Sequence, residues 1–256
     1  MRLAFFLALV LAAPTGVSAQ AASDTPRVIE RVKSSIVAVG TFQRTRAPQF
    51  RFLGTGFAVG DGATIVTNAH VLPTKLDSEH LETIAIAVPM PKRQVQVRPT
   101  TRGAADPAHD LALLRIQGAP LPALAVRDSD GVREGELVLF TGFPIGNVLG
   151  PFPATHRGMV AAITPIAIPP AHASQLDQRA IRQLASGAFP VFQLDATAYP
   201  GNSGSPVYAA DTGEVIGVVN MVFVKGTKEA ALTQPSGITY AIPSRHLVEL
   251  MKRGGQ

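Results

Sequence analysis

The sequence predicts an all-β protein built from two barrels, and three observations support this. About a dozen short segments are β-branched or alternate between apolar and polar residues, and glycine, proline or aspartate clusters separate nearly all of them. Helical periodicity is confined to a few stretches. A connector rich in proline and glycine, residues 117–135, divides the strands into two halves, so two barrels fit better than one.

The expected strands are Ile36–Thr41, Gly56–Val59, Thr64–Val66, Thr83–Val88, Gln94–Arg98, Ala112–Ile116, Glu136–Thr141, Gly158–Ile163, Val191–Leu194, Ser205–Tyr208, Val215–Met221 and Ile238–Ile242. Three stretches have helical character instead. The apolar residues of 28–32 recur at helical spacing, Ala171–Ala185 is a polar, helix-compatible insert, and a C-terminal helix is expected from Ser244, as its N-cap, to a stop at Gly254.

The composition supplies a core and excludes several kinds of chemistry. Hydrophobic residues make up 46% of the chain and charged residues 16%, which rules out disorder. The formal charge of +5 is carried by scattered Lys and Arg, which favours a solvated surface over a nucleic-acid or membrane partner. The absence of cysteine excludes thiol catalysis and cysteine-ligated zinc, and without any HExxH pattern we expect no metal and no cofactor.

Residues 1–19 have the pattern of a secretory signal peptide. Arg2 precedes an apolar run from Leu3 to Ala13, and the small residues Val17-Ser18-Ala19 then form a cleavage site. The run is shorter than the roughly 20 apolar residues that cross a bilayer. We therefore expect an exported protein, periplasmic or secreted, with no stable membrane insertion after cleavage and a flexible mature N-terminus over residues 20–27.

Three short motifs, each bordering an expected strand, carry the chemistry: TNAHV at 67–71, HDLALL at 109–114 and GNSGSP at 201–206. They contain His70, Asp110 and Ser203. Serine acyl transfer needs a hydroxyl, an imidazole that accepts its proton, and a buried carboxylate that orients the imidazole. The chain order His, Asp, Ser is that of the chymotrypsin arrangement and not of the subtilisin or α/β-hydrolase orders.

Glycines beside Ser203 fit an oxyanion hole, because backbone N–H donors in a tight turn leave no room for side chains. We expect Gly201, Asn202 and Ser203 to form it, with Gly201 and Ser203 donating together. Two alternatives stay open: His109 competes with His70 as the base, and Asp106 competes with Asp110 as the acid. The other histidines are interpreted as surface residues: His80, His156, His172 and His246.

At these residues the sequence resembles the trypsin-like serine peptidases, in particular their HtrA/Deg-type branch. The resemblance covers roughly residues 28–250 and follows the family's order. The matching segments are GTGF at 54–57, TNAHV at 67–71, DLALL at 110–114, DATAYPGNSGSP at 195–206, GEVIGV at 213–218 and GITYAIPS at 237–244.

The resemblance implies two perpendicular six-stranded β-barrels with the His70, Asp110 and Ser203 triad between them. The protease domain would span 28–253, with barrel one over about 28–125, barrel two over about 135–243 and the helix over 244–253. It implies a serine endopeptidase acting on proteins or peptides through an acyl-enzyme. Since the sequence ends soon after residue 243, we expect no PDZ domain. The alternative is a binding or chaperone module with a misaligned triad.

The pattern also implies a specificity pocket. In this fold its base lies six residues before the nucleophile, which is Thr197, whereas Asp195 lies eight before it and does not predict cleavage after Lys or Arg. The remaining lining residues are expected to be Ala198, Val219, Asn220 and Met221, which make an apolar pocket. The insert Ile166–Pro190 is the part that the resemblance covers least, and the oligomeric state is not predicted.

Overall fold

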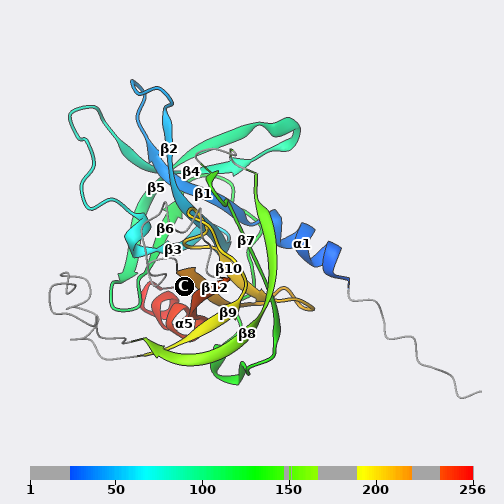
Figure 1. The fold of residues 1–256 in the computed structure, drawn as a ribbon. Coiled ribbons are helices and arrows are strands. Elements are labelled where there is room, and N and C mark those ends of the chain that lie inside the picture. The colour runs from blue at the N-terminus through cyan, green and yellow to red at the C-terminus, as the bar shows by residue number, and fades with distance from the viewer. Residues whose placement is uncertain (1–23, 147–149, 151, 167–188, 221–236, 256) are drawn as a thin grey trace, which may run out of the picture.

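Two closed antiparallel barrels make up the computed structural model, which describes residues 24–146, 150, 152–166, 189–220 and 237–255 (Figure 1). Barrel one contains β1 (Ile36–Phe42), β2 (Phe50–Val59), β3 (Thr64–Asn68), β4 (Thr83–Pro89), β5 (Val95–Asp106) and β6 (Leu111–Ile116), in the order β1-β2-β3-β6-β5-β4. Barrel two contains β7 (Leu137–Gly142), β8 (Ala154–Ile166), β9 (Phe189–Asp195), β10 (Pro206–Ala209), β11 (Val215–Asn220) and β12 (Ile238–Pro243), in the order β10-β11-β12-β9-β8-β7. The predicted fold class is confirmed.

Two strands are longer than the sequence indicated. β2 begins at Phe50, six residues before the expected start, because the glycines at 54 and 56 interrupt its apolar pattern without interrupting its pairing with β1. A Cβ on Gly56 would lie 2.9 Å from the carbonyl oxygen of Val66, so the close approach of β3 requires glycine there. β5 continues to Asp106 past a bulge between Arg102 and Ala105.

The core has three parts, and the third joins the barrels. Alternating side chains fill the interior of barrel one, including Val37, Ile65, Ile86 and Leu114. A second set fills barrel two, including Val138, Phe140, Leu194 and Ile216. The third cluster takes members from both barrels and both helices, among them Phe57, Leu111, Tyr208, Val218 and Leu247. Burial of this shared cluster holds the barrels in one fixed arrangement.

The first helix, α1 (Thr25–Lys33), begins three residues before the helical spacing of residues 28–32. It has a proline in its first turn, and residues 25–27 of the expected lead-in are helical. Val28 and Val32 are buried, and Arg31 donates to the carbonyl oxygen of Thr212. The expected signal peptide, residues 1–19, and the expected insert helix Ala171–Ala185 lie outside the described residues.

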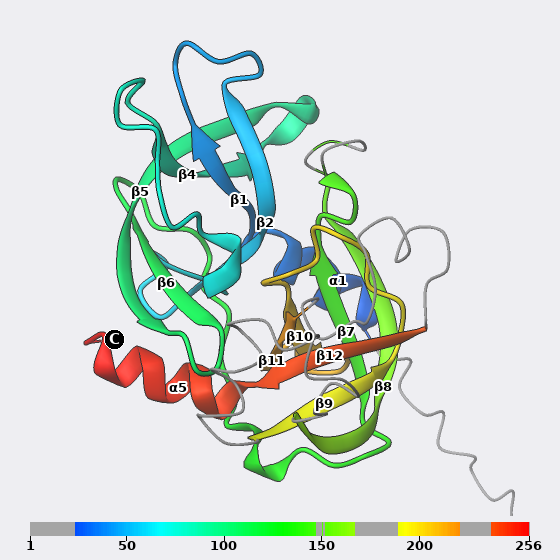
Figure 2. The ribbon, with the colours of Figure 1, turned by 60° about the vertical axis from the view of Figure 1, so that its left-hand side comes forward.

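The C-terminal helix, α5 (Ser244–Arg253), lies across both barrels and contacts β5 and β6 as well as β11 and β12 (Figure 2). Ser244 is its first residue and not its N-cap. Its hydroxyl donates to the carbonyl oxygen of Arg127 at 2.5 Å, and Pro243 occupies the cap position. None of the helices in the described part of the chain is long and apolar enough to span a membrane.

Candidate active site

The three candidate residues come from separate turns that meet where the barrels join. His70 lies in a single 3-10 turn, Ala69–Val71, directly after β3. Asp110 ends the connection between β5 and β6, and Ser203 precedes β10. The main chain of the Asp110 turn is fastened to the His70 turn, because the Asp110 carbonyl oxygen accepts from the backbone N–H of Ala69 at 3.0 Å and from the Asn68 amide at 3.1 Å. These bonds place acid and imidazole side by side.

A continuous polar relay connects the three side chains. His70 Nδ1 lies 2.5 Å from Asp110 Oδ2, and His70 Nε2 lies 3.1 Å from Ser203 Oγ. The other carboxylate oxygen of Asp110 accepts from the His70 backbone N–H at 2.8 Å. With Nδ1–H directed at the carboxylate, Nε2 presents its lone pair to the serine hydroxyl, which is the tautomer that a general base needs.

Asn220 has a different place from the one that the sequence suggested. It was expected in the specificity pocket, but its side chain is fully buried and its amide donates to Asp110 Oδ2 at 2.8 Å. Together with the two bonds from His70, this donor fixes the carboxylate from a third direction. Asp110 itself has φ of 53°, a left-handed conformation that non-glycine residues adopt mainly at constrained sites. The only sequence signal was a polar residue at the end of an otherwise apolar strand.

The turn that carries Ser203 depends on two glycines. Gly201 and Gly204 have φ of 102° and 87°. A Cβ on Gly201 would lie 2.3 Å from the Phe143 carbonyl oxygen, and one on Gly204 would lie 2.1 Å from the Thr55 carbonyl oxygen. Conformation and space therefore both require glycine. The backbone N–H of Thr55 donates to the Ser203 carbonyl oxygen at 2.9 Å and ties the turn to barrel one.

Of the three residues expected to form the oxyanion hole, one has a backbone N–H that is already hydrogen-bonded. The Asn202 N–H donates to the Tyr199 carbonyl oxygen at 2.9 Å and is not available to a substrate. In the part of the chain that the structure describes, the N–H groups of Gly201 and Ser203 have no protein acceptor. Because Ile145 N–H binds the Pro200 carbonyl oxygen at 2.7 Å, the planar peptide directs the Gly201 N–H to the opposite side.

The competing residues have partners of their own. His109 Nδ1 lies 2.9 Å from Asp106 Oδ2, and the guanidinium of Arg253 donates to the same oxygen at 2.6 Å. Among the described residues, Asp106 makes no hydrogen bond or ion pair with His70. His246 stacks on His109 with ring centroids 3.7 Å apart and is 7% exposed, so its assignment to the surface was wrong. His156 stacks on Phe140, and burial lowers its pKa. His80 is exposed, and His172 lies outside the described residues.

The pocket residues are partly assembled. Ala198 and Val219 are buried in the apolar cluster of barrel two, and Thr197 is half-buried. Met221 lies outside the described residues. Thr239 on β12, which the sequence did not single out, accepts from the Ala198 N–H at 3.0 Å and donates to the Ala196 carbonyl oxygen at 2.7 Å. It holds the segment that contains the expected pocket base.

Within the described residues, no three His, Asp or Glu side chains are grouped so that they could hold a metal ion. The described residues at the barrel junction offer a hydroxyl, an imidazole, a carboxylate and two backbone donors. That set suits acyl transfer through a serine nucleophile.

Comparisons with known proteins identify related sequences and structures. Residues 54–218 match the family model described as the trypsin-like peptidase domain. The mitochondrial serine protease HTRA2 of Bos taurus is 34% identical over 202 residues, which cover 78% of this chain and 36% of that protein. A probable periplasmic serine endoprotease, DegP-like, of Marinomonas sp. is 28% identical over 207 residues, which cover 80% of this chain and 36% of that protein. The chain thus spans only 36% of the length of each of these relatives.

Among solved structures, the HtrA-type protease AlgW with a tripeptide superposes with a TM-score of 0.63 at 24% identity, covering 89% of this chain and 62% of that one. The same protease with a decapeptide gives a TM-score of 0.62 at 24% identity, covering 89% and 66%. At this level of identity the superpositions establish the shared fold of the two barrels.

Proposed function

Because the chain belongs to the trypsin-like peptidase family, we propose that it is an exported serine endopeptidase that uses Ser203, His70 and Asp110. The observation that carries this proposal is the relay of two short contacts, 2.5 Å from Asp110 to His70 and 3.1 Å from His70 to Ser203. The relatives named above are serine proteases, which supports the same reaction class. The substrates are proteins or peptides, and no cofactor takes part.

In the first half of the reaction, Ser203 Oγ bonds to the scissile carbonyl carbon while its proton passes to His70 Nε2. Asp110 stabilises the resulting imidazolium and remains ionised. His70 then gives that proton to the departing amide nitrogen, the C–N bond breaks, and an acyl-enzyme remains. Water enters, loses a proton to His70, attacks the ester, and the same proton returns to Ser203.

The negative charge that develops on the carbonyl oxygen is stabilised by the N–H groups of Gly201 and Ser203. The Ile145 contact to Pro200 supports this role, because it keeps the Pro200 carbonyl oxygen away from the side on which the Gly201 N–H lies. Removing one such donor typically costs about 2.7–4 kcal/mol of transition-state stabilisation.

The side chain before the scissile bond enters a pocket with Thr197 at its base and Ala198 and Val219 in its walls. None of these carries a charge, so small or medium aliphatic residues such as Ala, Val or Leu are preferred over Lys and Arg. The differences between aliphatic residues are modest, since one methylene in an apolar pocket contributes about 1–3 kcal/mol. Thr239 positions the pocket by its two bonds to the 196–198 segment.

Export rests on the signal-peptide pattern of residues 1–19 and on the word periplasmic in the description of the Marinomonas relative. Cleavage after Ala19 gives a mature protein that begins at Gln20.

A covalent fluorophosphonate label tests the proposal. We expect the purified protein to be labelled at Ser203 and to cleave peptides, Ser203→Ala to lose both properties, and the neighbouring Ser205→Ala variant to keep them. Equal cleavage by Ser203→Ala and wild type would exclude this nucleophile. A folded wild type that is neither labelled nor active would favour the alternative, a binding module with a misaligned triad.

A further inference from the structure

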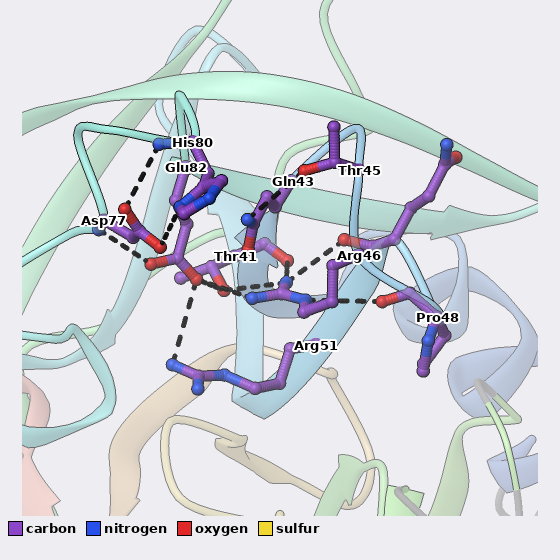
Figure 3. Close-up of polar contacts among 10 residues, drawn as sticks. Thr41, Gln43, Thr45, Arg46, Pro48, Arg51, Asp77, His80 and Glu82 are labelled. Carbon is purple, nitrogen blue, oxygen red and sulfur yellow. Dashed lines mark hydrogen bonds and ion pairs between the residues drawn. The ribbon is translucent and has the colours of Figure 1, made fainter.

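Arg51 is an exposed cation beside the candidate active site whose donors are not used. It lies on β2, its side chain is 54% exposed, and its one ion pair is a long one, 3.9 Å to Glu82 Oε1. Among the described residues its guanidinium makes no hydrogen bond, although it has five N–H donors. Figure 3 shows the Arg51 side chain below the hydrogen-bonded group around Arg46, joined to it by the long contact to Glu82.

The neighbouring acid is already satisfied. Glu82 accepts from Thr41 Oγ1 at 2.5 Å, from Arg46 at 2.7 Å and from the Asp77 backbone N–H at 3.1 Å, and its side chain is 7% exposed. We call Thr41, Arg46, Arg51, Asp77 and Glu82 the Glu82 cluster (Figure 3). Because Glu82 is buried and bonded on all sides, an approaching carboxylate would meet Arg51 and not an open acid.

The second acid of the cluster is also paired. The Asp77 carboxylate binds the ring and the backbone N–H of His80. Arg44, in the same hairpin as Arg46, adds a further exposed positive charge. Of the two arginines in the Glu82 cluster, Arg46 is hydrogen-bonded to the acid and Arg51 is the cation with free hydrogen-bonding capacity among the described residues.

The strand register places Arg51 near Ser203. Three residues further along β2, a Cβ on Gly54 would lie 3.0 Å from the Ser203 carbonyl oxygen, and the next residue, Thr55, donates to that oxygen. An extended strand rises about 3.3 Å per residue and β2 has a bulge between Phe52 and Gly54, so Arg51 lies at most about 10 Å along β2 from Gly54. Glu82, which Arg51 faces, belongs to the connection between His70 and β4.

The direction of the substrate follows from the proposed reaction. The acyl half occupies the pocket of barrel two around Ala198, whereas the leaving half is protonated by His70 on barrel one. The leaving half therefore runs over barrel one towards β2. Its second and third residues lie about 7–10 Å from the scissile bond, within reach of a long arginine side chain.

Resting on the proposed function, we propose that Arg51 binds an acidic side chain at the second or third residue after the scissile bond. A guanidinium forms two parallel hydrogen bonds with a carboxylate, which supplies geometric selectivity as well as charge. The residue is thus a specificity determinant for the leaving half of the substrate.

Matched peptides test this. They share one cleavage site and carry Asp or its neutral isostere Asn at the second or third residue after it. We expect kcat/KM for the Asp peptide to be about tenfold higher at low salt, the size of one charge-assisted hydrogen bond, and the ratio to fall as salt rises. Arg51→Gln brings the ratio close to one and leaves the Asn peptide unchanged. Arg44→Gln, the matched control in the same hairpin, keeps the ratio.

A second variant reverses the charge of Arg51, and its expected change in substrate preference would not occur if Arg51 had only a structural role. Arg51→Glu is expected to favour Lys over Asp at the same substrate position. Labelling of Ser203 tests the peptidase assignment independently of the role proposed for Arg51. A labelled, active enzyme with equal rates for Asp and Asn peptides would refute the role of Arg51 and leave the peptidase assignment standing. An unlabelled and inactive protein would refute both.

Discussion

The Glu82 cluster and the group around Asp106 each use a nearly buried carboxylate to connect segments that are distant in the sequence. We call Asp106, His109, His246 and Arg253 the Asp106 cluster. In each, a carboxylate that is nearly buried, with 7% exposure for Glu82 and 8% for Asp106, joins segments distant in sequence. The Glu82 cluster joins the β1–β2 hairpin to the connection that follows His70. The Asp106 cluster joins the turn that contains Asp110 to α5.

The clusters differ in the chemistry of the donors. Hydrogen bonds from Thr41, from the Asp77 backbone and from Arg46 outweigh burial and lower the pKa of Glu82 to about 2. Burial opposes ionisation of Asp106, but hydrogen bonds from His109 and Arg253 outweigh it and lower the pKa of Asp106. Burial and the neighbouring charges of His109 and Arg245 lower the pKa of His246 to about 4. The donors to Glu82 are a hydroxyl, a backbone N–H and an arginine, whereas the Asp106 cluster also contains the imidazole of His246, whose pKa is shifted.

The comparison predicts the largest effect for Glu82→Ala. Arg46 is 22% exposed on its side chain and would lose its counter-ion in a site that water reaches poorly. We expect the free energy of unfolding to fall by about 3–5 kcal/mol, measured by urea denaturation. Glu79→Ala, an exposed acid in the same connection, is the control and should cost under about 0.5 kcal/mol. Equal losses in the two variants would show that the cluster is not an anchor.

A smaller loss is expected from Asp106→Ala. Its partner Arg253 is 58% exposed and can regain water when the carboxylate is removed. We therefore expect a loss of about 1–3 kcal/mol in the same assay. Since Asp110 follows in the same turn, kcat should fall more than KM rises. If Asp106→Ala lost more free energy of unfolding than Glu82→Ala, the exposure of the arginine partner would not be what sets the size of the loss.

The pH dependence of the free energy of unfolding distinguishes the Asp106 cluster, which contains His246, from the Glu82 cluster. Between pH 6.5 and about 4 the unfolded chain protonates His246 while the folded chain does not, so stability is full above pH 6.5 and falls as pH is lowered. The slope is at most about 1.4 kcal/mol per pH unit for one proton. His246→Phe, which keeps a ring against His109, should flatten it. Glu82→Gln should leave the slope above about pH 5.5 unchanged, because the stability that Glu82 contributes is lost only as pH falls from the region of its ordinary pKa of 4.5 towards its folded pKa of about 2.

The smallest effects come from replacing each arginine by lysine. Arg46 uses all three guanidinium nitrogens, on Glu82, Thr41, Pro48 and Gln49, so Arg46→Lys should cost about 1 kcal/mol. The Arg253 side chain is 58% exposed and donates one hydrogen bond, to Asp106, within the described residues, so Arg253→Lys should change stability by under about 0.5 kcal/mol. If both substitutions change stability by the same amount, the hydrogen-bonding geometry of the guanidinium is not what distinguishes the Glu82 cluster from the Asp106 cluster.

Strand periodicity predicted most of the fold. All the expected strands have counterparts in the two barrels, because alternation of apolar residues is a local property that burial of one face preserves. The expected boundaries of strands and helices are wrong where tertiary contacts override the local apolar pattern. Glycines hid the start of β2, a bulge hid the end of β5, and Pro243 took the cap position expected for Ser244. The start of α1 at Thr25 was hidden by a polar, proline-containing lead-in.

For the candidate site, the motifs gave the three relay residues but not their supports. Nothing local distinguishes Asn220 as a donor to Asp110, since the two are 110 positions apart and meet only when β11 of barrel two reaches the junction with barrel one. The same holds for Thr239 beneath the pocket and for the commitment of the Asn202 N–H to Tyr199. His246 was misread because a histidine on a helix carries no local sign of what covers it.

The sequence by itself determined the strand alternation, the glycines that a tight serine turn requires, and the residue types of the relay in their chain order. These depend on backbone conformation and intrinsic chemistry, which each short segment carries with it. Only the tertiary structure decided which carboxylate faces His70, which backbone donors remain free, and which cations pair with Glu82 and Asp106. Those choices depend on distances between segments of both barrels and α5, and such distances are set by the packing of the shared core, which no single segment encodes.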